Sequence, residues 1–124
     1  MANTFRNKTS KAVGTSFFQV GANSAGASQS GAYAVPSSTE TTVIGLSVSN
    51  VTTSSVDVDV ALSATMANTT NDISLGTTIP VPAGSTVVLI GGDQKIVLNV
   101  GHKIIVTSDT ASSADVIMSF LEIT

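Results

Sequence analysis

The chain of 124 residues has no cysteine and no tryptophan, and it has only one tyrosine and one histidine. The absence of cysteine excludes disulfide scaffolds, cysteine-ligated zinc sites and thiol catalysis. Charged residues make up only 10% of the chain, against about 25% in ordinary soluble domains. No apolar run reaches the roughly 18 residues that suggest a membrane-spanning helix. Because the first residues also lack the apolar core of a signal peptide, we expect folding in the cytoplasm.

Hydroxyl and β-branched side chains take the place of the missing charges. Serine and threonine together account for 35 residues, and valine and isoleucine for another 25. So many β-branched residues are untypical of a disordered chain, and they pack well on a pleated sheet. A chain of this length is expected to form one domain.

The few positive charges are concentrated near the start of the chain. Arg6, Lys8 and Lys11 are three of the five cations, and residues 12–94 contain none. A small-residue stretch follows, which cannot offset its ordering entropy by burial. We therefore divide the chain into an extended N-terminal arm with a short strand (1–20), a flexible Gly/Ala/Ser linker (21–32) and a β-sandwich domain (33–124).

The sandwich prediction depends on apolar residues that alternate with a period of two. Val56–Ser63 is the clearest half-buried strand. In Thr41–Asn50, the alternation predicts that Ile44, Leu46 and Val48 share one face. About eight to nine short strands, with turns every 8–12 residues, indicate an all-β antiparallel β-sandwich or jelly-roll-like barrel.

The last expected strand, Ala114–Ile123, is apolar on both faces. Val116, Met118 and Phe120 lie on one face, and the other face carries Ile117, Leu121 and Ile123. Such a strand is either central between two layers or buried against another subunit.

Residues that could perform catalysis or bind a metal are sparse. His102 is interpreted as a turn residue, because Gly101-His102 has the pattern of a two-residue type II′ hairpin. Asp57 and Asp59 share one face of a strand, where a solvated surface is the simpler interpretation. We expect no catalytic, cofactor or metal residues and no enzyme. The acidic body, whose aromatic residues are not interleaved with cations, argues against nucleic-acid binding.

Several segments, taken in order, resemble a family of small virion structural proteins of tailed bacteriophages, common in marine and cyanobacterial T4-like phages. The segments are Met1–Asn7, Val13–Ser16, Tyr33–Pro36, Thr42–Asn50, Pro80–Ser85, Gly91–Lys95 and Ser112–Ile123. The resemblance implies a non-enzymatic particle component of the capsid cement (decoration) type, which binds the major capsid protein or other virion subunits. It also implies assembly in the host cytoplasm and a homo-oligomer, with a trimer preferred. A neck, tail or fibre-adaptor protein, or a receptor- or glycan-binding module, are the alternatives.

Charge segregation and the two-sided last strand together predict a partner interface. On the arm, we expect the cations to meet acidic surface on a neighbouring subunit while phenylalanines anchor the contact. The last strand contributes its second apolar face. The candidate residues are Phe5, Arg6, Lys8, Lys11, Phe17, Phe18, Ile117, Leu121 and Ile123.

Overall fold

A computed structural model of the chain describes residues 3–16, 18–22, 32–63, 73–91 and 94–124. All regular secondary structure in these residues is β, which confirms the all-β prediction, and none of them forms a helix that could cross a membrane. The nine strands are β1 (Asn3–Val13), β2 (Phe18–Gln19), β3 (Glu40–Asn50), β4 (Val56–Ser63), β5 (Ile73–Val81), β6 (Thr86–Ile90), β7 (Ile96–Leu98), β8 (Lys103–Ser108) and β9 (Ala114–Ile123).

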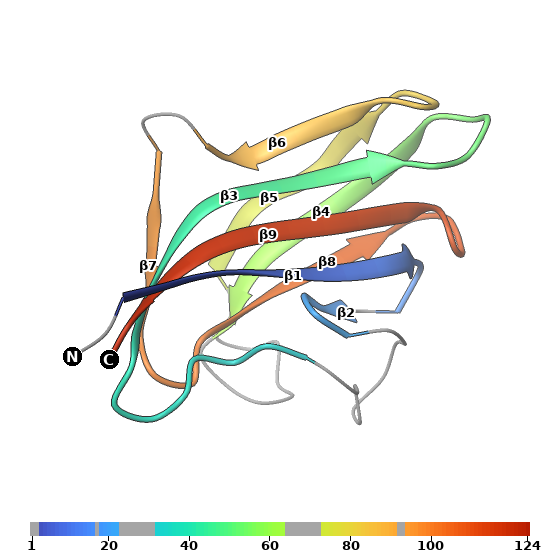
Figure 1. Cartoon of the computed structure of the whole chain (residues 1–124). Helices are drawn as coiled ribbons and strands as arrows, with labels where there is room; N and C mark the ends of the chain where they lie inside the picture. Colours follow the sequence, from blue (N-terminus) through green and yellow to red (C-terminus); the bar gives the residue numbers. More distant parts are fainter. Residues whose placement is uncertain (1–2, 17, 23–31, 64–72, 92–93) are drawn as a thin grey trace.

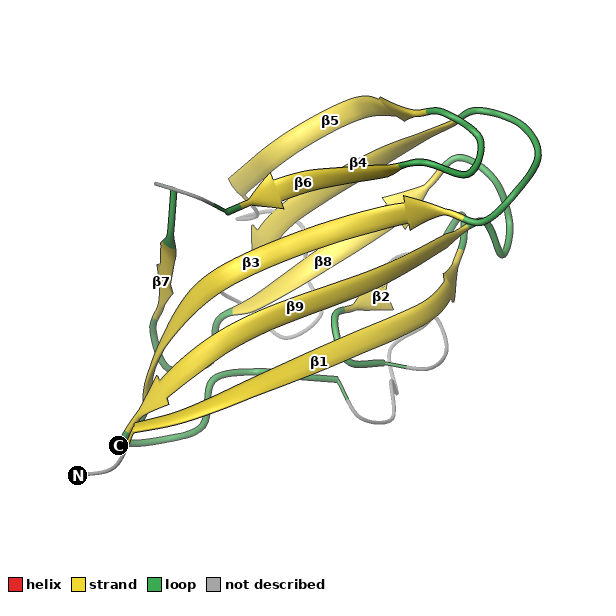
Figure 2. Cartoon of the chain, turned by 45° about the horizontal axis from the view of Figure 1, so that its top comes forward, coloured by secondary structure: helices red, strands yellow, loops and turns green. Residues whose placement is uncertain are grey.

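The strands form two antiparallel sheets that lie in two layers, which agrees with the predicted sandwich (Figure 1). The first sheet has the order β1-β9-β3-β6, and β7 pairs with the other end of β3. The second sheet has the order β2-β8-β4-β5. Figure 2 shows β9 between β1 and β3 along most of its length.

The hydrophobic core lies between the layers and follows the alternation of the strands. β9 contributes Val116, Met118 and Phe120, and β4 contributes Val56, Val58 and Val60, all of them buried. These are the inward residues that the period of two predicts. Lys103 on β8 is among the largest fully buried side chains of the described residues, and its Nζ donates to the carbonyl oxygen of Gly101 at 3.4 Å.

The first residues are built into the five-stranded sheet. We expected an extended arm with only a short strand, but β1 covers eleven residues and pairs with β9 from Asn3↔Ile123 to Val13↔Ala114. Few of its side chains are apolar, so hydrophobic periodicity could not reveal this strand. Backbone pairing accounts for it, because β9 has a second edge of N–H and C=O groups that needs a partner.

Two local predictions are wrong because of features that the periodicity does not encode. A β-bulge between Val43 and Gly45 reverses the alternation in β3, so that Val43 is buried with Leu46 and Val48 while Ile44 is half-buried. The Gly101-His102 connection is not a hairpin, since β7 pairs with β3 in one sheet and β8 lies in the other. The segment before β3 binds this turn, because Gly101 N–H donates to Val35 O at 2.9 Å.

Candidate protein-binding face

The outer face is the side of the five-stranded sheet that points away from the core. The pairing of β1 with β9 places Phe5 opposite Leu121 and Thr9 opposite Ile117, with Asn7 and Ser119 between these pairs. The other strands continue the same face through residues that pair with it: Thr42 and Ser47 on β3, Val88 on β6 and Val97 on β7. Ile44 on β3 has no paired residue, but it lines the same depression as Phe5 and Ser119.

The outer face exposes large apolar side chains from four strands. Phe5 is 74% exposed and Ile117 is 45% exposed, while Val88 and Val97 are each more than half exposed. Single exposed apolar residues are common, whereas several on one face mark a surface for protein or membrane contact. The serines and threonines between them keep the face hydrated without charge.

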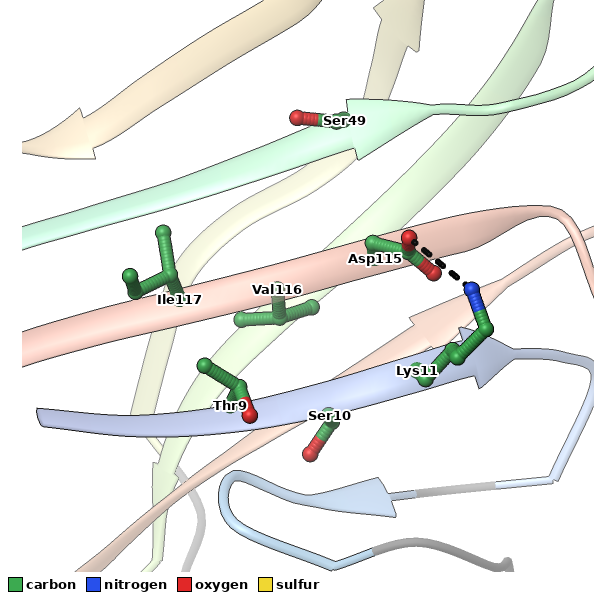
Figure 3. Close-up of a pocket in the computed structure, with 7 residues that line it drawn as sticks. All are labelled: Thr9, Ser10, Lys11, Ser49, Asp115, Val116 and Ile117. Carbon is green, nitrogen blue, oxygen red and sulfur yellow. Dashed lines mark ion pairs between the residues drawn. The ribbon is translucent and has the colours of Figure 1, made fainter.

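Two shallow depressions lie along β1 and β9 on this face. The first has a volume of about 310 Å³ and is lined by Thr9, Ser10, Lys11, Ser49, Asp115, Val116 and Ile117 (Figure 3). At its rim, Lys11 Nζ lies 3.8 Å from Asp115 Oδ2. The second depression has a volume of about 230 Å³ and is lined by Phe5, Arg6, Asn7, Ile44, Ser119 and Phe120. The face therefore carries both a protruding phenyl ring and a depression that could accept one.

Within the same chain, two of the three clustered cations already form ion pairs. Arg6 Nε donates to Glu122 Oε1 at 2.6 Å, and Lys11 pairs with Asp115. Lys8 is half-buried and pairs with Met118 across the strands. The predicted attraction between the arm of one copy and the body of another is therefore partly satisfied inside one molecule.

The other predicted interface residues are divided between the core and the outer face. Phe18, on β2, is only 6% exposed and packs in the core. Phe17 lies outside the described residues. Leu121 and Ile123 are half-buried on β9, on the same face as Ile117. The register thus brings Phe5, near the start of the sequence, onto the same face as three residues near its end: Ile117, Leu121 and Ile123.

The inner side of this sheet contains a polar cluster that sequence reasoning missed. Tyr33 donates its hydroxyl proton to Glu122 Oε2 at 2.7 Å, and Thr41 Oγ1 lies 2.8 Å from the same hydroxyl. The tyrosine ring packs on Phe120 with 4.4 Å between centroids. Burial raises the pKa of Tyr33 above its ordinary value, and the nearby Glu122 carboxylate adds to the rise. Nothing in the spacing of these residues could have predicted that they meet.

Sequence reasoning also missed three apolar members of the outer face: Ile44, Val88 and Val97. The bulge in β3 turned Ile44 outward. Val88 lies in the continuous apolar run Val87–Ile90, which does not indicate which of its residues face the core. Alternation alone would have predicted that Val97 points outward, since Ile96 and Leu98 on either side of it point inward.

The residues considered for catalysis or metal binding have local structural contacts. His102 lies in the turn between β7 and β8, where its Nδ1 accepts the Asn99 N–H at 3.2 Å. Asp59 Oδ1 accepts the Thr78 N–H at 2.6 Å. Among the residues that the structure describes, no group of three His, Asp or Glu side chains could hold a metal ion.

The fold and the outer face together define a two-layer β-sandwich with an apolar, hydroxyl-rich sheet surface. No protein-family model, curated protein or solved structure matches the chain.

Proposed function

We propose that this protein is a non-enzymatic structural component of a tailed-phage particle, of the kind that binds and stabilises the major capsid lattice. The observation that carries the proposal is the outer face, where apolar side chains of four strands are exposed together. The ordered resemblance to small virion proteins supports the phage assignment.

The chemistry of the outer face suits permanent burial against protein. Between its two ends the paired residues of the face are hydroxyl, amide and apolar, and its described ion pair, Lys11–Asp115, lies toward one end. Arg6, which lines the second depression, is already paired with Glu122. Removing such a face from water needs no desolvation of central charges, which is the main cost of a polar interface. Stable protein interfaces are built in the same way as this face, with an apolar centre and a polar rim.

The stoichiometry of purified particles tests this function. We expect quantitative mass spectrometry to find this protein in a copy number comparable to that of the major capsid protein. A few copies per particle would contradict lattice binding and indicate a neck, tail or fibre position. Complete absence from particles would overturn the proposal.

Reconstitution then tests the outer face itself. Particles that lack this protein would be incubated with the wild-type chain, with Leu121→Asp and with Val51→Asp. Leu121 lies on the outer face, whereas Val51 is exposed beyond the end of β3 and past the last paired residue of that strand. We expect Leu121→Asp to lower incorporation at least tenfold, and the Val51 control to bind like the wild type. Equal binding of all three chains would exclude a role for this face.

A further inference from the structure

We propose that the occupant of the outer face is a second copy of this chain, packed face to face around a two-fold axis. The inference rests on the proposed function and makes it more specific: the outer face joins two copies, and the particle takes up the dimer. A substitution on this face would then lower incorporation because it breaks the dimer. Three features support it: the symmetry of the residue rows, the absence of charge at the centre and the area of the face.

The rows of β1 and β9 are symmetric about one level of the sheet. Asn7 pairs with Ser119, and two residues to either side lie the pairs Phe5–Leu121 and Thr9–Ile117. A two-fold axis that crosses the strands at Asn7–Ser119 would place Phe5 of one copy above Thr9 of the other. The same rotation would place Leu121 of one copy above Ile117 of the other.

In this arrangement the protruding residue of each copy faces a depression of the other copy, so the same contact forms twice. Phe5 is the most exposed large apolar side chain of the described residues, and Thr9 and Ile117 line the depression of about 310 Å³. Each phenyl ring would enter the depression of the other copy. Such reciprocity is what a two-fold interface requires, because one patch must be complementary to itself.

The charges on the face favour a copy of this chain over a charged partner. Any side chain near the axis meets its own equivalent, so a central charge would repel itself. The central rows contain only Phe5, Asn7, Thr9, Ile117, Ser119 and Leu121 on β1 and β9, and Lys11 with Asp115 lies one row farther out. A partner recognised by its charge would have little to bind at this centre.

The area of the face is close to that of a stable interface. Strands lie about 4.8 Å apart and rise about 3.3 Å per residue, so four strands with their side chains cover roughly 25 Å by 30 Å. This area of about 750 Å² per copy approaches the ~800 Å² per partner that specific complexes bury. Sheets packed in this way lie about 10 Å apart.

Sedimentation of the full chain over a range of concentrations tests the dimer. We expect a mass twice the 12.5 kDa of the chain. Ile117→Asp is expected to weaken association at least tenfold, since it places a carboxylate beneath Leu121 of the other copy and in the lining of the depression that receives the phenyl ring. Val51→Asp is expected to leave association unchanged. Phe5→Ser, at the more exposed position, replaces Ile117→Asp if circular dichroism shows that the latter is unfolded. A monomer at all concentrations, or a trimer, would overturn the two-fold arrangement.

Cross-linking tests the position of the axis, because the chain has no cysteine of its own. Ser119→Cys would place one thiol per copy beside the axis, so a short bis-maleimide is expected to join two copies rapidly. Val51→Cys is the control, and equal rates for both variants would contradict the proposed axis. A monomer that still enters particles would refute only the dimer, whereas a dimer that is absent from particles would refute only the virion function.

Discussion

At the residue scale, Tyr33 joins three parts of the molecule that are distant in sequence. Its hydroxyl contacts Thr41 on β3 and Glu122 on β9, and Glu122 in turn pairs with Arg6 on β1. Since the tyrosine has one hydroxyl proton and donates it to Glu122, Thr41 acts as the donor in its own bond with Tyr33. The cluster therefore satisfies a buried carboxylate and fixes the segment before β3 against the sheet.

The alkaline stability of the protein is predicted to depend on Tyr33. Burial raises the pKa of its hydroxyl above the ordinary value of 10.0. Above pH 10 the unfolded chain therefore loses this proton while the folded chain keeps it, so the free energy of unfolding falls as the pH rises. Urea unfolding between pH 7 and pH 11 is expected to show this fall in the wild type and a smaller one in Tyr33→Phe.

Two further measurements separate titration from simple loss of a contact. At pH 7 we expect Tyr33→Phe to lower the free energy of unfolding by about 1–3 kcal/mol, because Glu122 and Thr41 lose a buried partner. Because Tyr33 is the only tyrosine, tyrosinate absorbance reports its ionisation directly. A midpoint at pH 10 in the folded protein would refute the raised pKa.

At the element scale, β1 explains why the cations are clustered. It is an end strand of its sheet, and its other edge pairs with no described strand. Charged side chains, lysine above all, discourage such an edge from pairing with other chains. Arg6, Lys8 and Lys11 thus protect the edge, which leaves the outer face as the surface for association.

The end of β1 contains a backbone irregularity that gives a second prediction. Ala12 has a φ of 59°, the register shifts between Ser10 and Val13, and Ala12 N–H donates to Asp115 Oδ1 at 2.9 Å. A β-branched residue tolerates this conformation poorly. Ala12→Val is expected to lower the free energy of unfolding by about 1 kcal/mol or more.

Ala12→Gly is the matched control, because glycine adopts a positive φ without steric cost. We expect this variant to unfold at a urea concentration equal to or above that of the wild type. If the valine variant proved as stable as the glycine variant, the backbone conformation at Ala12 would not be a source of strain.

At the scale of the whole molecule, the first and last strands pair with each other in the five-stranded sheet. Asn3 pairs with Ile123, and β9 lies between β1 and β3. Val13, Phe18 and Val20 complete the core from the N-terminal side. The first twenty residues are thus needed for the fold, whatever they contribute to assembly.

Deleting residues 2–18 is therefore expected to destabilise the entire sandwich. The deletion removes the partner of one β9 edge together with two buried apolar side chains, each contributing about 1.5–3 kcal/mol, out of a typical total of about 5–15 kcal/mol. Thermal unfolding followed by circular dichroism measures the loss. Replacing Lys8 and Lys11 with glutamine keeps the strand and the Arg6–Glu122 pair, and it serves as the control. A truncated chain with the wild-type melting temperature would contradict the structural role of β1.

Much of the fold could be predicted from the sequence because the signal is local. Val56–Ser63 and Ala114–Ile123 form strands with the predicted bounds, since alternation decides which side chains are buried. Polar strands escape this reasoning, as β1 shows. So does a bulge, because one extra residue in β3 moved Val43 into the core and Ile44 out of it.

The candidate face was predicted in part, from β9 and Phe5. The all-β class, the low charge and the two-sided apolar character of β9 follow directly from composition and alternation. Three contacts could be known only from the folded chain: Phe5 lies opposite Leu121, Arg6 pairs with Glu122, and Phe18 is in the core. Such contacts join residues more than a hundred positions apart or on different sheets. Strand register and layer packing create them, and neither is encoded in a local pattern.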